Sequence, residues 1–198
     1  MKSVNRSVYP YMKRGVDIIL SFFAILLLFP VMLVIGIIVK ASSKGPVFFT
    51  QKRMGKDDRI FTILKFRSMY IETPRDVATS ELSDATKFIT PVGAFLRKTS
   101  LDELPQLFNI IKGDMSLVGP RPALYTQENL IRLRAESGAN KVRPGLTGLA
   151  QINGRDEIPE ELKAQYDAQY VEELSAKNDI KILFTTIKKV VKSEDIKH

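Results

Sequence analysis

The sequence predicts an α+β protein that is mostly helical, and three observations support this fold class. An apolar segment without charges, residues 18–39, predicts a long membrane-associated helix near the N-terminus. Two short runs of β-branched and aromatic residues, 47–51 and 60–66, predict a β-hairpin. The remaining chain shows helical periodicity and helix-capping residues. We therefore expect two parts, a basic membrane segment over residues 1–44 and a second domain over residues 45–198.

Composition excludes several classes of catalytic site. The chain of 198 residues contains no Cys, and its only His is the last residue, His198. Disulfide frameworks, cysteine nucleophiles and zinc sites built on Cys or paired His are therefore ruled out, and a Ser-His-Asp triad is disfavoured. Any chemistry must use carboxylates, Lys, Arg, Tyr, hydroxyl groups or a metal ion held by oxygen.

The positive charge is concentrated at one end of the chain. The formal net charge is +8. Residues 1–56 hold nine cationic residues and one acidic residue, which equals the whole excess, whereas residues 57–198 hold 21 of each. A nucleic-acid-binding domain more often spreads its basic residues over a folded face. The distribution therefore disfavours nucleic acid as a partner and favours an anionic membrane surface.

The apolar segment has the length of a bilayer-spanning helix. Its 22 residues would form a helix of about 33 Å, close to the thickness of a bilayer core. Cations precede it (Lys13, Arg14) and follow it (Lys40, Lys44), so both ends would be drawn to the cytoplasm. Pro30 removes a backbone donor and should kink the helix. These residues leave two alternatives open, a kinked spanning helix and a re-entrant hairpin whose arms meet at Pro30.

Helix-start and helix-stop residues divide the rest of the chain. Thr90 followed by Pro91 is typical of an N-cap and a first helical residue, and predicts a helix over 92–98. A second helix should begin at Ser100 and end at Lys112-Gly113. Further helices are predicted over 127–137, 159–175 and 179–193, and irregular segments over 52–59, 70–89, 114–123 and 143–155.

The helix predicted over 179–193 is amphipathic. Its apolar residues recur at helical spacing opposite a face of lysines: Ile180, Leu183, Phe184, Ile187, Val190 and Val191. One interpretation is a helix packed on the core. The other is an interfacial helix on the membrane surface.

The sharpest chemical feature is the acidic pair Asp102-Glu103. One interpretation is structural, because Ser100 and Glu103 have the spacing of a capping box. Two details weaken it: Asp102 adds a second carboxylate, and Pro105 disfavours a regular helix through that turn. Adjacent helical residues point about 100° apart, so the two acids would take different roles. One could attack a substrate or bind a metal, and oxygen ligands of this kind suit Mg²⁺.

Cations also gather in loops that contain Gly and Pro. Proline stiffens such loops, glycine lets the backbone approach a ligand, and guanidinium groups match phosphate oxygens. Four such segments near an acidic pair make a polyphosphate site plausible, although each cation alone could serve a structural ion pair. The segments are Lys65-Phe66-Arg67, Gly119-Pro120-Arg121-Pro122, Arg143-Pro144-Gly145 and Asn153-Gly154-Arg155.

Three longer motifs resemble those of the bacterial sugar transferases, the monotopic polyprenyl-phosphate phosphoglycosyl transferases. They are LKFRSM at 64–69, TSLDELPQLFNIIKGDMSLVGPRP at 99–122 and RPGLTGLAQINGR at 143–155, preceded by the apolar segment with Pro30. The resemblance covers the chain from Lys13 to about Val191 and corresponds to the catalytic core alone, without the multi-span N-terminal domain of larger family members.

The resemblance implies a specific reaction. Family members move a sugar-1-phosphate from a UDP-sugar to a polyprenyl phosphate such as undecaprenyl phosphate, release UMP, and use Mg²⁺. By this resemblance Asp102 would be the nucleophile that forms a covalent phosphosugar intermediate and a ligand of the metal, with Glu103 as its catalytic partner. The other residues carried over are Pro120, Arg121 and Pro122 in a nucleotide-site turn, Lys65, Arg67 and Arg155 as phosphate contacts, and Asp167 as an active-site acid.

The resemblance also implies a location and partners. It favours the re-entrant hairpin broken at Pro30, in the bacterial inner membrane on its cytoplasmic face, against anionic lipids. Family members often have a Ser before this proline, whose hydroxyl can bond a freed carbonyl, but this chain has Phe29. Downstream glycosyltransferases and a second copy of the chain could be further partners. The rival interpretations are a membrane-anchored binding module for an anionic lipid or protein, and a nucleic-acid-binding protein.

Overall fold

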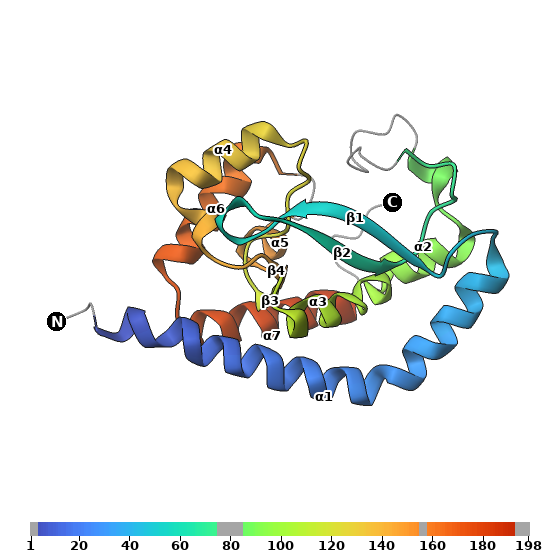
Figure 1. The fold of residues 1–198 in the computed structure, drawn as a ribbon, viewed down its shortest axis with the longest axis horizontal. Coiled ribbons are helices and arrows are strands. Elements are labelled where there is room, and N and C mark those ends of the chain that lie inside the picture. Colours follow the sequence, from blue (N-terminus) through green and yellow to red (C-terminus); the bar gives the residue numbers. More distant parts are fainter. Residues whose placement is uncertain (1–3, 75–84, 155–157, 193–198) are drawn as a thin grey trace.

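The computed structural model describes residues 4–74, 85–154 and 158–192, and it is mostly helical with two small sheets (Figure 1). The predicted fold class, α+β and mostly helical, is confirmed. A long N-terminal helix lies along one side of the molecule, and some of the other elements pack against it (Figure 1).

Helix α1 (Val4–Ser42) contains the apolar segment and is long and apolar enough to cross a membrane. It is continuous through Pro30 but visibly bent, with its C-terminal part turned up toward the β-hairpin (Figure 1). A proline inside a helix removes one hydrogen bond and crowds the preceding turn, which gives a physical reason for the bend. Whether the helix re-enters the same leaflet stays a prediction. Most apolar side chains on α1 are exposed, as for Leu27 at 78%.

The predicted β-hairpin is confirmed. Strands β1 (Phe48–Met54) and β2 (Ile60–Phe66) pair antiparallel, with Phe48 opposite Phe66 and Met54 opposite Ile60. Strand β1 extends three residues beyond Gln51, where the predicted strand ended. The connection between the strands is correspondingly shorter and contains a 3₁₀ turn η1 (Lys56–Asp58).

The segment that follows the hairpin contains η3 (Ala85–Phe88) and α2 (Pro91–Lys98). The Thr90 side chain accepts a hydrogen bond from Gly93 N at 2.9 Å, as expected of an N-cap. The prediction of a single helix from Ser100 to Lys112 is wrong, because the segment is not continuous. It is divided into a 3₁₀ turn η4 (Leu101–Glu103) and α3 (Gln106–Lys112), because Pro105 interrupts regular helix formation.

Two strands form where irregular segments were expected, so the prediction for 114–123 and 143–155 is corrected in part. Strand β3 (Ser116–Val118) pairs in parallel with β4 (Gly145–Thr147). Three-residue strands carry little local signal, and this pairing joins segments far apart in sequence. The backbones approach closely: a Cβ on Gly145 would lie 2.1 Å from Gly119 N, so only glycine fits.

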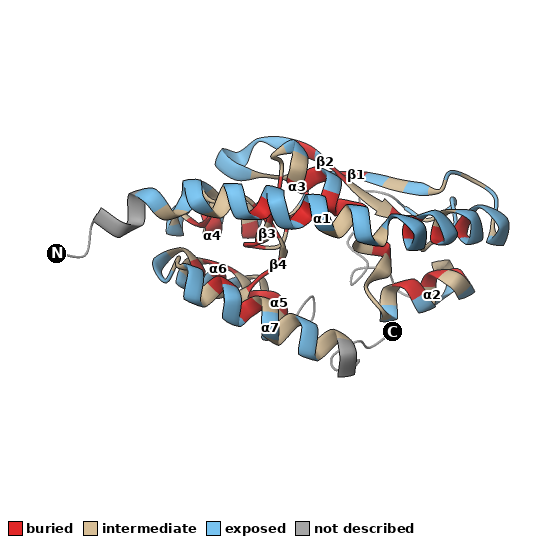
Figure 2. Cartoon of the chain, turned by 90° about the horizontal axis from the view of Figure 1, so that it is seen from below, coloured by how far each residue is buried: buried red, intermediate tan, exposed pale blue. Residues whose placement is uncertain are grey.

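The C-terminal helices are α4 (Glu128–Ser137), α5 (Leu149–Ile152), α6 (Glu160–Glu172) and α7 (Ala176–Lys192), with a 3₁₀ turn η5 (Ala139–Lys141) after α4. They agree with the predicted helices apart from α5. Helix α7 is packed on the core at Ile182, which is fully buried, whereas Ile180, Phe184 and Ile187 are 53–70% exposed. An interfacial role for the exposed residues stays a prediction. Helices α1 and α7 lie on the same side of the molecule, where both display exposed residues (Figure 2).

Polar contacts fasten α1 to the rest of the protein. Lys13 Nζ lies 2.7 Å from Asp179 Oδ2 on α7, and the Arg14 guanidinium donates to the carbonyls of Ile110 and Ile111 at the end of α3. Further along, Met32, Ile35 and Val39 of α1 pack with Phe66 and Leu96 in one hydrophobic cluster. The long helix is therefore docked at both ends rather than tethered only by its C-terminus.

Candidate active site

Glu103 is the centre of a cluster of charges that the sequence had predicted in parts. Its Oε1 lies 2.7 Å from Lys65 Nζ and 3.3 Å from a terminal nitrogen of Arg121. Lys65 comes from β2, Glu103 from η4, and Arg121 from the turn after β3. Three segments separated in the sequence thus bring their charges to one place. Burial alone would raise the pKa of Glu103, but the two cations outweigh it and lower the pKa to about 2.

Asp102 lies next to Glu103 in a different electrostatic state. It is 8% exposed, and its carboxylate makes no ion pair within 4 Å among the residues that the structure describes. Burial raises its pKa to about 6, although the nearby charge of Lys65 works in the opposite direction. The two adjacent acids therefore differ: Glu103 is permanently ionised and held, while Asp102 is buried, unpaired and titrates near neutrality.

The capping-box interpretation of this turn is wrong. Ser100 has a left-handed backbone (φ 57°) and its side chain makes no capping hydrogen bond. The Glu103 side chain, which a capping box would direct to the backbone, instead binds Lys65 and Arg121. The short turn and Pro105 point the two carboxylates into the interior of the protein, so helix capping does not explain either acid.

The turn that carries Arg121 is held on both sides. The Pro120 carbonyl accepts from Gly145 N at 2.8 Å, and the Pro122 carbonyl accepts from Arg53 at 3.0 Å. Both prolines are buried. The predicted Pro-Arg-Pro turn is thus a rigid support that presents Arg121 to Glu103. Arg53 was not predicted as part of this support, and no local pattern links it to residue 122.

Arg67 does not join the cluster. It is 6% exposed, and its guanidinium donates to the carbonyls of Val39, Ser43 and Lys44 at the C-terminal end of α1. These carbonyls lack helical partners, and a cation there also favours the helix dipole. The structure therefore gives Arg67 a structural position at the C-terminal end of α1, and this geometry does not support the prediction that it contacts phosphate.

Asp167 and Arg155, the other two predicted residues, are placed differently. Asp167 on α6 is fully buried and pairs with Arg134 on α4 at 2.7 Å. Burial raises its pKa against the lowering effect of Arg134. The structure therefore joins Asp167 to Arg134 rather than to the Glu103 cluster. Arg155 lies outside the described residues.

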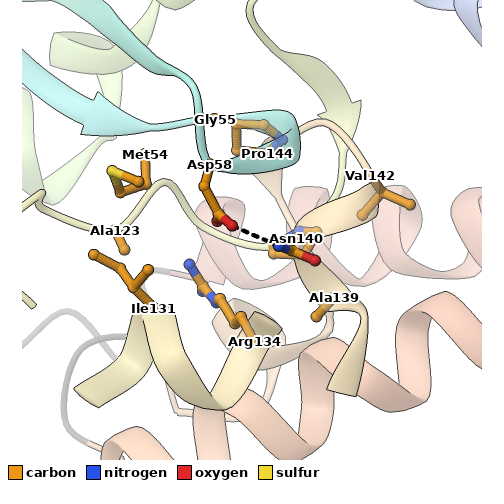
Figure 3. A pocket seen from close by; sticks show the side chains of 11 residues that line it. Met54, Gly55, Asp58, Ala123, Ile131, Arg134, Ala139, Asn140, Val142 and Pro144 are labelled. Atoms are coloured by element: carbon orange, nitrogen blue, oxygen red, sulfur yellow. Dashed lines mark hydrogen bonds between the residues drawn. The ribbon is translucent and has the colours of Figure 1, made fainter. Parts of the chain in front are cut away.

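A small pocket lies beside Arg134, and Pro120 of the Pro-Arg-Pro turn is one of its walls (Figure 3). Asn140 donates to Asp58 across it at 2.7 Å. The acidic pair does not line this pocket. Its walls are Met54, Gly55, Asp58, Pro120, Ala123, Ile131, Arg134, Ala139, Asn140, Val142 and Pro144.

A metal ion would find one free carboxylate here. Among the described residues no three His, Cys, Asp or Glu side chains gather as a metal site. Glu103 is already paired with two cations, which leaves Asp102 as the available protein ligand. Such a site fits Mg²⁺ only if the ion takes most of its ligands from water and substrate phosphates, as Mg²⁺ commonly does.

These features define a protein with a membrane-length apolar helix docked on a domain that holds a buried acidic pair among cations. The chain belongs to the bacterial sugar transferase family, whose sequence model matches residues 8–193. The resemblance inferred from the three motifs is thereby confirmed.

Several relatives carry functional names. A UDP-glucose:undecaprenyl-phosphate glucose-1-phosphate transferase of Escherichia coli K12 is 41% identical over 194 residues, which cover 94% of this chain and 41% of that protein. A UDP-N-acetylgalactosamine-undecaprenyl-phosphate N-acetylgalactosaminephosphotransferase of Aeromonas hydrophila is 38% identical, covering 93% of this chain and 44% of the relative. The chain spans about 40% of the length of these curated relatives.

A relative of similar length also exists. The uncharacterized sugar transferase EpsL of Bacillus subtilis 168 is 42% identical over 187 residues, which cover 93% of this chain and 90% of EpsL. The family therefore includes a protein in which nearly the whole length corresponds to this chain.

Proposed function

We propose that this protein is a UDP-sugar:polyprenyl-phosphate sugar-1-phosphate transferase that uses Asp102 as a covalent nucleophile. The observation that carries the proposal is the contrast within the acidic pair. Glu103 is neutralised by Lys65 and Arg121, whereas Asp102 is buried without an ion-pair partner among the described residues. The names of the relatives support a UDP-sugar as donor and undecaprenyl phosphate as acceptor.

The reaction divides into two displacements. An Asp102 oxygen attacks the β-phosphorus of the UDP-sugar, the new bond from oxygen to phosphorus forms, and the bond from that phosphorus to the bridging oxygen breaks. UMP leaves with the electron pair. An oxygen of the polyprenyl phosphate then attacks the phosphosugar, the bond to Asp102 breaks, and the carboxylate is regenerated. Splitting one transfer into two steps is ordinary covalent catalysis.

The cations around Glu103 have a clear task in this scheme. Phosphoryl transfer depends mainly on positioning and on stabilisation of the charge at phosphate oxygens. Glu103 holds Lys65 and Arg121 beside Asp102, where both cations can face a diphosphate and keep the neighbouring nucleophile ionised. We also propose Mg²⁺ as cofactor, with Asp102 as its protein ligand; when bound it would neutralise charge on the diphosphate.

The membrane-facing surface fits a lipid acceptor. Helix α1 is apolar and largely exposed, and Ile180, Phe184 and Ile187 of α7 are exposed. The two helices lie on the same side of the molecule (Figure 2). An amphipathic helix of this kind can lie in the membrane interface with its apolar face buried. We propose a monotopic protein on the cytoplasmic face of the bacterial inner membrane, with α1 as a re-entrant hairpin and α7 as an interfacial helix.

The decisive experiment measures UMP release by the full chain with a panel of UDP-sugars and undecaprenyl phosphate, with and without Mg²⁺. Asp102→Asn should abolish turnover, with a loss of about a thousand-fold or more, because the amide lacks the carboxylate oxygen that forms the bond to phosphorus. It should not lower the melting temperature, since ionisation of a buried unpaired carboxylate costs stability above its raised pKa. Asp57→Asn, at an exposed turn, is the matched control.

Two outcomes would contradict the proposal. If Asp102→Asn kept most of its activity, Asp102 would not be the nucleophile. If the wild-type protein released no UMP from any UDP-sugar, the binding-module alternative would be favoured. Topology is tested separately in this naturally Cys-free chain. Single Cys labels at residues 8 and 44 should both react from the cytoplasmic side, and opposite sidedness would contradict the hairpin.

A further inference from the structure

Gln151 is a buried polar side chain without a hydrogen-bond partner in the described part of the chain. It lies on α5, is 8% exposed, and neither its Nε2 nor its Oε1 makes a hydrogen bond to a described residue. Burying an amide without a hydrogen bond lowers the stability of the folded state, and such groups are rare in folded proteins. A side chain kept at that cost calls for an explanation outside the folding of the free protein.

The position of Gln151 connects it to the proposed site. A Cβ on Gly148 would lie 2.7 Å from Gln151 Oε1 and 2.1 Å from Gly119 O, so the amide lies over a glycine that packs directly on Gly119. Gly119 N also donates to Thr147 O at 2.9 Å. Gly119 begins the turn that presents Arg121 to Glu103. Gln151 therefore lies on α5, next to the backbone at Gly148 and Gly119 that supports the turn of Arg121.

The chemistry of an amide restricts what it could bind. A Gln side chain offers a donor and an acceptor side by side. A phosphate oxygen would satisfy only the donor and leave Oε1 buried and unpaired. A neutral group that offers both an acceptor and a donor satisfies both atoms at once. Within a UDP-sugar, the imide edge of uracil and neighbouring hydroxyl groups of a sugar ring have this character.

We propose that Gln151 is a substrate-positioning residue that binds a neutral donor-and-acceptor group of the UDP-sugar, either the nucleoside or the transferred sugar. This inference rests on the proposed function. It assigns Gln151 a task distinct from that of Lys65 and Arg121, which face phosphate charge. The unpaired amide is then a ligand-binding group held ready at the expense of stability, as is common in functional sites.

The test uses the full chain with Gln151→Met, which keeps length and removes both polar atoms, and Gln165→Met on the exposed surface of α6 as the control. Without ligand, Gln151→Met should melt at the same temperature as wild type or higher, because an unpaired buried amide is removed. The KM for the UDP-sugar should rise about ten-fold or more, while the KM for undecaprenyl phosphate stays unchanged. Loss of a residue with a purely structural role would not raise the KM of one substrate and leave the KM of the other unchanged.

Thermal shifts with ligand identify the group that is bound. If Gln151→Met loses the shift caused by UMP, the nucleoside is the bound group. If it keeps the UMP shift but loses the larger shift caused by the UDP-sugar in the absence of acceptor, the bound group is the sugar. If both shifts and the KM match wild type, the proposal is overturned.

A second variant, Gln151→Leu, guards against a packing defect specific to Met. A lower unliganded melting temperature in both apolar variants would assign Gln151 a structural role and overturn the proposal. Failure of the proposed function is distinguishable, because then the wild-type protein releases no UMP from any UDP-sugar. A wild type that turns over, combined with unchanged Gln151 variants, contradicts only this inference.

Discussion

Two buried clusters in this protein pair a carboxylate with a cation, and they use charge differently. In η4, Glu103 accepts from both Lys65 and Arg121, and the adjacent Asp102 makes no ion pair with any described residue. Between α4 and α6, Asp167 pairs with Arg134 at 2.7 Å, and the charge of Lys163 also acts to lower the pKa of Asp167. The first cluster has two cations for one bound acid. The second is balanced within the fold.

The difference separates a site from a structural pair. A balanced ion pair between two helices fixes their packing and has no charge to offer a ligand. A cluster with excess positive charge beside a free carboxylate can bind an anion and direct a nucleophile at it. The sequence placed Asp167 and Arg121 in the same predicted site, but the structure assigns them to these two different arrangements.

The largest effect on stability is expected from the helix pair. Arg134→Met would leave Asp167 buried without its partner, and breaking a buried pair costs about 3–5 kcal/mol of unfolding free energy. The pKa of Asp167, already raised by burial, should rise further, so the loss should be greater at pH 8 than at pH 5. Urea unfolding followed by circular dichroism measures both values. Arg132→Met, in an exposed pair with Glu136, is the control and should cost about 0.5 kcal/mol or less.

An effect of Asp167 on activity alone would contradict the structural role of the Asp167–Arg134 pair. If Asp167→Asn removed UMP release while leaving stability unchanged, Asp167 would belong to the active site, as the family resemblance had suggested. The comparison between the two clusters would then have to be abandoned.

A slightly smaller effect, now on activity, is expected from the other cluster. Lys65→Met should lower kcat/KM for the UDP-sugar about a hundred-fold or more, since removing one donor to a developing phosphate charge typically costs about 3 kcal/mol. Arg121 would still neutralise Glu103, so the protein should fold. Steady-state UMP release measures the effect, with Lys98→Met on the exposed end of α2 as the control. Wild-type activity in Lys65→Met would show that the cluster is only structural.

The smallest effect sharpens the roles of the two adjacent acids. Asp102 must be ionised to attack, so activity should rise with pH through about 6, the pKa of Asp102. Glu103, with a pKa near 2, should add no limb to the profile above pH 4. Lys65→Met removes a cation that lowers the pKa of Asp102, so the acid limb of its residual activity should move to higher pH. A profile whose acid limb is the same in both proteins would argue against Asp102 as the ionising group.

Local sequence patterns predicted much of the fold, but they could not predict elements that depend on contacts between distant residues. Thr90-Pro91, the β-branched and aromatic runs of the β-hairpin and the helical periodicity of α7 are all local patterns, and the elements that they predict were confirmed. Strands β3 and β4 were not predicted, because their pairing depends on a close backbone approach at Gly119 and Gly145 rather than on local residues.

In the candidate site, too, local patterns predicted some residues correctly and others not. The acidic pair, Lys65 and Arg121 were identified from charge and motif, and the structure brings them together. Arg67 carries an equally suggestive pattern but binds the end of α1. No local signal distinguishes a guanidinium that faces a ligand from one that satisfies helix carbonyls. Gln151 was missed because a neutral amide attracts notice only once its burial and lack of partners are known.

The contacts of Lys13 and Arg14 affect the distance between Asp102 and the lipid headgroups. Both cations flank the apolar segment, yet Lys13 is paired with Asp179 and Arg14 with the end of α3. That same helix, α3, follows directly after the turn that holds Asp102. If α1 lies in a membrane, these contacts fix the distance from the headgroups to Asp102, because they join α1 to the elements that carry the site. Lipid composition could then alter how much protein is bound without altering the reach of the nucleophile.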